Sequence, residues 1–212
     1  MFSRILFVLL LIAATLLSSG VQAQFYIGPN GSDTNSGTLN APFATFARAQ
    51  QAMQNSSVKT TYVMAGTYHP AAFDTGGGDT VALYLSAPDA GQTWSYNPPD
   101  GYGSAIIDGG SSSATTGIKT GFTIDGASGV SVVGLQYQNF AREFLHSGNN
   151  SPNTIFAYNI VHGNYDSNNT GGITLWQSAQ NSSVIGNVVY NIKLTVFWRQ
   201  PVVVAVLGAW MG

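Results

Sequence analysis

The chain has 212 residues, a formal net charge of −2 and only 8% charged residues. This balance offers no basic surface of the kind that binds nucleic acid, so nucleic acid is not an expected partner. The chain also lacks cysteine. A disulfide framework is therefore excluded, and stability must come from buried apolar side chains and backbone hydrogen bonds.

Residues 1–23 have the pattern of a signal peptide. A short positive start, Met1 to Arg4, precedes the apolar run Ile5 to Leu17, which is too short for an ordinary membrane span. The small residues up to Ala23 form a cleavage pattern. We expect a secreted protein, extracellular or periplasmic, whose mature form begins at Gln24 and has no membrane span. An uncleaved N-terminal anchor is the alternative.

The mature chain begins with a strand predicted at Phe25 to Ile27 and a turn-rich segment. Thr45 then has the character of a helix cap. The helix that follows would place four apolar residues on one face, namely Phe46, Ala49, Ala52 and Met53. We expect this helix to cover the open apolar end of a stack of strands.

Further short strands are predicted where apolar runs are bounded by Gly, Pro or Asn, namely Thr61 to Met64, Val81 to Ser86 and Ala105 to Asp108. The stretch Ala87 to Gly103 contains Pro98, Pro99 and Gly101. It is predicted to be a long surface loop that overhangs one face of the molecule.

Residues 121–191 repeat one pattern three times, in which apolar strands alternate with polar turns. Val132, Phe156 and Val184 occupy the same position in each repeat, 24 and then 28 residues apart. Periods of this length mark units that must stack on their neighbours to bury a core. Because each unit consists of short β segments without helical periodicity, the pattern predicts an all-β, parallel solenoid.

Strand alternation sorts the repeated positions into inward and outward sets. The inward set is predicted to comprise Val132, Phe156, Val184, Tyr137, Val161 and Val189. A shared bend position holds Leu135, Asn159 and Asn187, where the two asparagines are expected to stack and to satisfy backbone groups of the turn.

Several motifs outside these positions are typical of one superfamily. They are FYIGPNGSDTNSGT from Phe25, APFAT from Ala41, AGTY from Ala65, Gly-Ile-x-Leu at Gly172 and Gly-Asn-x-Val at Gly186. Together they resemble the opening of exported right-handed parallel β-helix proteins of the pectin-lyase-like superfamily, over residues 24–192. The resemblance implies a right-handed parallel β-helix with an N-terminal capping helix. It does not fix the activity, because that superfamily includes polysaccharide lyases, glycoside hydrolases, epimerases and proteins without an assigned reaction.

One outward row is predicted to read Gln138, His162 and Tyr190 on successive coils, about 4.8 Å apart. An aromatic ring beside hydrogen-bonding groups suits a sugar, so Gln138 and Tyr190 are candidate substrate-binding residues. A second outward row contains Asp125 and Trp176, and Trp176 is a third candidate. Isolated aromatic residues are also ordinary on β surfaces, which is the structural alternative.

Lyase chemistry on a uronate chain requires a cation to neutralise the substrate carboxylate and a base to take the C5 proton. Arg142 is the candidate cation, and His162, or with less support His146, is the candidate base. Asp166 is a candidate calcium ligand, with Asn164, Asn168 and Asn169 nearby as oxygen donors. In the alternative reading, Arg142 forms a surface ion pair with Glu143 and the histidines are simply solvated.

The polar pattern stops at Lys193, and residues 194–212 form an atypical hydrophobic tail without Asn, Asp or Ser. This predicts one β-helix domain over residues 24–193, followed either by a hydrophobic cap or by the product of a truncation or frameshift. We expect a monomer that acts on extracellular polysaccharide, as a calcium-assisted lyase on acidic glycan or as a glycoside hydrolase if it is catalytic. The alternatives are a non-catalytic glycan-binding or adhesion solenoid, and an inactive fragment of a longer enzyme.

Overall fold

The computed structural model describes residues 24–76, 78–112, 117–164, 171–176, 179–192 and 203–205. The predicted signal peptide, Asp166 and most of the hydrophobic tail lie outside these residues. The described chain is mostly β, with one α-helix, α2 (Phe46–Gln54), and two 3-10 helices, η1 (Ala87–Asp89) and η2 (Pro98–Asp100). None of the described helices has the length and apolar character needed to cross a membrane.

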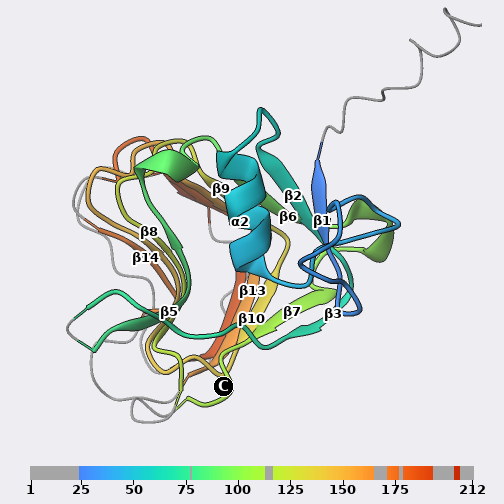
Figure 1. Ribbon diagram of the computed structural model, residues 1–212. Coiled ribbons are helices and arrows are strands. Elements are labelled where there is room, and N and C mark those ends of the chain that lie inside the picture. The colour runs from blue at the N-terminus through green and yellow to red at the C-terminus, as the bar shows by residue number, and fades with distance from the viewer. Residues whose placement is uncertain are drawn as a thin grey trace, which may run out of the picture.

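The strands form three sheets (Figure 1). In spatial order, the first sheet contains β1 (Phe25–Ile27), β2 (Thr60–Val63), β6 (Thr93–Tyr96), β9 (Ser131–Val133), β12 (Ile155–Ala157), β15 (Ser183–Ile185) and β17 (Val203–Ala205). The second contains β3 (Gly66–Tyr68), β7 (Ala105–Asp108), β10 (Gln136–Gln138), β13 (Ile160–Asn164) and β16 (Val188–Ile192). The third contains β4 (Phe73–Asp74), β5 (Thr80–Leu85), β8 (Thr120–Ile124), β11 (Glu143–Ser147) and β14 (Ile173–Leu175).

Strand pairing is parallel in all three sheets, apart from the short antiparallel pair β4 and β5. Successive passes of the chain contribute one strand to each sheet in the same order. Thus β9, β10 and β11 lie in the first, second and third sheets, and β12, β13 and β14 follow in the same order. Each pass therefore stacks on the previous one, which places residues from distant parts of the sequence in register on one face.

The predicted repeat register is confirmed. Phe156 lies opposite Val132 on one side and Val184 on the other, and all three side chains are buried. Tyr137 and Val161 are buried as predicted. Val189 is partly buried and packs against the same core. The alternation of the repeats thus identified the inward face correctly.

The predicted asparagine stack at the bend is also present. Asn159 Nδ2 donates to Val132 O (2.9 Å) and to Asn187 Oδ1 (3.0 Å), while Asn159 Oδ1 accepts from Leu135 N (3.0 Å). Asn187 Nδ2 donates in the same way to Phe156 O (2.8 Å). These amides bond backbone groups of neighbouring coils at the bend, so their role is structural.

Helix α2 forms where the sequence predicted it, and the Oγ1 atom of Thr45 caps it by accepting from Arg48 N (3.1 Å). Figure 1 shows α2 lying across the end of the strand stack. Its Phe46 ring meets Phe122 edge to face at 5.3 Å between centroids, and it also contacts Trp94. The helix therefore closes the apolar end of the core, as expected.

The prediction of a long overhanging loop at Ala87 to Gly103 is wrong. This stretch contains η1, β6 and η2, and β6 pairs with both β2 and β9 in the first sheet. Trp94 points inward and is completely buried. The four residues of β6 are too few to show a clear alternation, and the Gly and Pro residues on both sides gave the stretch the composition of a loop.

Candidate functional site

Four side chains of the second sheet stand in register on its outer face. Asp108 in β7 lies opposite Gln138 in β10, Gln138 opposite His162 in β13, and His162 opposite Tyr190 in β16. All four are partly exposed. We call Asp108, Gln138, His162 and Tyr190 the polar row. The predicted alignment of its last three members is therefore confirmed as geometry.

Asp108 organises the first half of the polar row. Its carboxylate accepts hydrogen bonds from Gln138 Nε2 (2.9 Å), from Asn139 Nδ2 (3.0 and 3.2 Å) and from the backbone N of Gly110 (2.8 Å). Burial alone raises the pKa of Asp108, but these hydrogen bonds and the charge of His69 outweigh it and leave the pKa lowered. Asp108 thus stays ionised and fixes the orientation of Gln138.

His162 occupies the second half of the row as a neutral, stacked ring. It lies parallel to the ring of Tyr190, with 4.7 Å between centroids and 14° between planes. Burial lowers the pKa of His162, and Asp108 only partly opposes this. Its Nε2 lies 3.0 Å from Gln136 Nε2. An amide nitrogen can only donate, so His162 Nε2 is the acceptor of this bond and its proton is on Nδ1.

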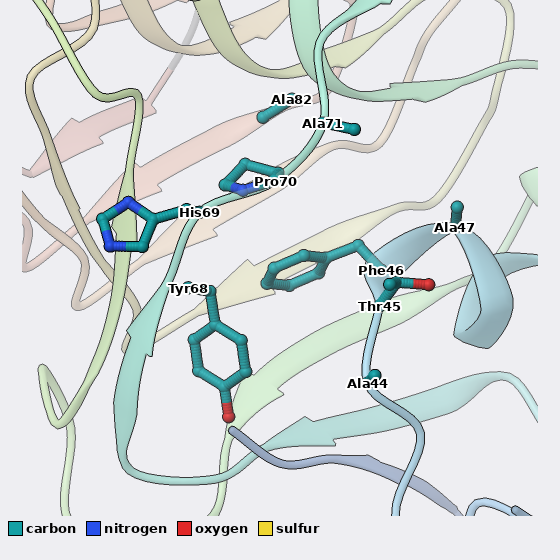
Figure 2. Close-up of a pocket in the computed structure, with 9 residues that line it drawn as sticks. All are labelled: Ala44, Thr45, Phe46, Ala47, Tyr68, His69, Pro70, Ala71 and Ala82. Carbon is teal, nitrogen blue, oxygen red and sulfur yellow. The ribbon is translucent and has the colours of Figure 1, made fainter. Parts of the chain in front are cut away.

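Two hollows adjoin the His69 end of this face. The larger is open, has a volume of about 380 Å³, and is lined by His69, Pro70, Ala72, Thr80, Asp108, Gly109, Gly110, Gly117 and Ile118. The smaller has a volume of about 170 Å³ and lies beside the start of α2. Figure 2 shows Phe46, Tyr68 and Pro70 around this smaller hollow, with the His69 ring turned away from Phe46. Its walls are mainly apolar, so the larger hollow is the one that continues the polar row.

Arg142 lies at the corner before β11. Its Nη1 is 2.7 Å from Asp79 Oδ1, the same oxygen that Lys119 Nζ approaches at 3.3 Å. Glu143 pairs instead with His146, at 2.9 Å, so the alternative of an ion pair between Arg142 and Glu143 is not what the structure has. Among the described residues, Arg142 contacts Asp79, whereas His162 contacts Gln136 and Tyr190. The proposed catalytic roles of Arg142 and His162 remain predictions.

Trp176 follows β14 on the third sheet. The register that pairs Ile124 with Ser147 and Ser147 with Leu175 places Asp125, Gly148 and Trp176 in one row. Trp176 is 41% exposed, which agrees with the predicted outward row. It belongs to a different sheet from Gln138 and Tyr190, so the three candidate substrate-binding residues divide between two faces.

The predicted calcium ligand Asp166 lies outside the described residues, and that prediction remains open. In the part of the chain that the structure describes, no three His, Cys, Asp or Glu side chains gather as a metal-binding group. Sequence reasoning missed Asp108 as a member of the polar row. The signal was available, because Asp108 ends the predicted strand Ala105 to Asp108 and would align with Gln138 if the repeat were extended upstream.

No family model matches the chain, and no curated protein matches it. A solved structure titled "Rhamnogalacturonan lyase" is similar, with a TM-score of 0.59 and 19% sequence identity. The alignment covers 79% of this chain and 51% of that structure, so the chain spans about half of its length. This likeness shows a shared fold built from parallel sheets.

Proposed function

We propose that this chain is an exported carbohydrate-active protein that binds polysaccharide along the polar row. We further propose that its three parallel sheets are the faces of a right-handed parallel β-helix. The observation that carries the binding proposal is the register of Asp108, Gln138, His162 and Tyr190 on one outer face. The fold shared with a polysaccharide lyase supports the choice of ligand class.

The chemistry of the row suits a glycan. A sugar ring offers hydroxyl groups that donate and accept hydrogen bonds, and an apolar face that stacks on aromatic rings. The amide of Gln138 and the imidazole of His162 supply the polar contacts, and the Tyr190 ring supplies the stacking surface. Because Asp108 and Gln136 hold these groups in place, little ordering is required when a glycan binds.

For the reaction we propose β-elimination on an acidic glycan, assisted by calcium held at Asp166, with Arg142 and His162 in the roles given above. The second candidate function is binding without catalysis. It is favoured by a specific observation: His162 Nε2 already contacts Gln136 and Arg142 already contacts Asp79. Either residue would have to leave its present partner before it could act on a substrate.

The binding proposal is tested by electrophoresis through gels that contain pectate, alginate or a neutral polysaccharide. Wild-type protein should be retarded by at least one polymer, and Tyr190→Ala and Gln138→Ala should migrate faster in that gel. Thr67→Ala, an exposed position on the same sheet outside the polar row, is the matched control and should behave as wild type. Retardation by none of the polymers, or equal retardation of all variants, would contradict the proposal.

The reaction is tested separately by following the absorbance of unsaturated products with and without calcium. Product that appears only with calcium and disappears in His162→Ala and Arg142→Ala supports the lyase. Binding without product on any polymer supports the non-catalytic module. A protein that neither binds polymers nor melts cooperatively would match the third alternative, an inactive fragment.

A further inference from the structure

Two basic side chains converge on one carboxylate oxygen at the corner where the chain enters the third sheet. Arg142 Nη1 lies 2.7 Å from Asp79 Oδ1, and Lys119 Nζ lies 3.3 Å from the same atom. Residues 24–192 contain four Lys or Arg residues, so half of them meet at this point. We call Lys119 and Arg142 the basic pair. It is a preformed site for a carboxylate, which the chain's own Asp79 occupies.

The strand register holds the basic pair together. Arg142 N donates to Lys119 O (2.8 Å), and the residues that follow, Thr120 in β8 and Glu143 in β11, lie opposite each other. The two cations therefore project from neighbouring coils whose backbones are about 4.8 Å apart. Lys119 Nζ also donates to Gly78 O (2.6 Å), which orients the ammonium group. Because the backbone already positions the pair, little ordering is required when a carboxylate binds.

The charges at this corner do not balance. Glu143 follows Arg142 in the sequence, but its carboxylate lies 2.9 Å from His146 Nδ1 and accepts from Thr174 Oγ1 (3.1 Å). Asp79 is thus the carboxylate that contacts the basic pair among the described residues. Two cations and one carboxylate leave an excess of one positive charge, which attracts a further anion.

Asp79 can be replaced by another carboxylate at the basic pair. Its side chain is 49% exposed, and exposed ion pairs contribute little to stability. Its backbone is held separately, because Asp79 O accepts from Thr75 N and from Thr75 Oγ1, both at 2.9 Å. The carboxylate can therefore rotate away from the cations while these backbone contacts stay in place.

We propose that the basic pair binds the carboxylate of one uronate unit of an acidic glycan, and that Asp79 competes with the glycan for this place. The uronate carboxylate accepts from Arg142 Nη1 and Lys119 Nζ after the Asp79 side chain has rotated away. The open hollow of about 380 Å³ is lined by Thr80 and Ile118, the chain neighbours of Asp79 and Lys119, and it offers space for the sugar ring. The ligand class rests on the proposed function, whereas the role of Lys119 and the competition by Asp79 rest on the contacts of the basic pair.

The test is electrophoresis of the full chain through calcium-free gels that contain pectate, alginate or methyl-esterified pectin, with a gel without polymer as the reference. The Kd follows from the retardation at several polymer concentrations. Asp79→Asn removes the competing charge and should bind pectate or alginate about three- to tenfold more tightly than wild type. Binding of the methyl ester should not change, because its ester groups are neutral. The gain should fade as NaCl rises from about 0.05 M to about 0.5 M, because salt screens exposed charges.

Asp74→Asn is the matched control, because it removes the same charge from the same hairpin. The Asp74 carboxylate accepts from Gly76 N (2.8 Å) and not from the basic pair, so this variant should bind as wild type. Adding Lys119→Gln or Arg142→Gln to Asp79→Asn should abolish the gain. Asp79→Ser should give the same gain, and it decides the matter if Asp79→Asn misfolds.

Three results would overturn the proposal: no gain on either acidic polymer, an equal gain in Asp74→Asn, or a gain that survives the loss of either cation. The proposed binding along the polar row fails on a different result, namely equal retardation of wild type and Tyr190→Ala. The comparison of Asp79→Asn with Asp74→Asn does not involve the polar row, so the two failures are distinguishable.

Discussion

Replacing Asn159 by leucine tests whether the asparagine stack stabilises the fold. The equivalent position in the preceding coil is Leu135, so the bend accommodates a leucine side chain. The substitution removes the partners of two buried backbone groups, Leu135 N and Val132 O. Leaving a buried polar group unpaired costs about 1–3 kcal/mol, and burial of the leucine offsets about 1.5–3 kcal/mol at most. Two such groups cost about 2–6 kcal/mol together, so with the leucine offset we expect a net loss of about 2 kcal/mol in the free energy of unfolding.

The assay is urea unfolding followed by tryptophan fluorescence, since Trp94 is completely buried in the core. Asn40→Ala, an exposed turn residue, is the matched control and should change stability by less than about 0.5 kcal/mol. The reasoning is refuted if Asn159→Leu loses less than about 1 kcal/mol with an unchanged m-value. In that case the bend would satisfy its backbone groups without the amide.

Three further predictions concern the cap, the helix start and pH. Phe46→Ala should lower the free energy of unfolding by about 3–5 kcal/mol, because it empties a buried ring site at the end of the core; a melting temperature within a degree or two of wild type would contradict the capping role. Thr45→Ala should cost about 0.5–2 kcal/mol in urea unfolding by removing the N-cap acceptor, and Thr45→Ser should retain most of that stability. His162 has a lowered pKa in the folded state, so the unfolded chain takes up the proton first, and stability should fall as pH drops below the unfolded pKa of about 6.5. His162→Gln should remove that part of the pH dependence in unfolding curves measured between pH 7.5 and 5, and an unchanged profile would show that His162 stays solvated.

The repeat region was predictable because its signal is redundant. Val132, Phe156 and Val184 recur at the same position of successive repeats. Each of them therefore indicates independently which residues of the strands point inward. The same register predicts Gln138, His162 and Tyr190 in one row from the sequence alone. A single short strand such as β6 has no second copy to align with, and the sequence around Trp94 was therefore interpreted as a loop.

Contacts between sheets were not predictable in this way. The pairing of Glu143 with His146, rather than with Arg142, depends on how the chain turns the corner before β11. The close approach of His146 Nε2 to Gly148 depends on a side-chain rotamer that sequence spacing does not define. Sequence spacing orders residues along and across strands, but it carries no information about which polar atoms approach one another at a corner.

The stacked parallel pairing also has a consequence for how this chain folds. The strands that pair in parallel are far apart in the sequence. Val132 and Phe156 are 24 residues apart, and Val81 and Thr120 are 39 residues apart. Pairing at such separations closes long loops and slows folding. Each coil, however, needs only the coil before it as a template. Folding can therefore start at the coils closed by α2 and advance toward the C-terminus, in the order in which the chain is synthesised.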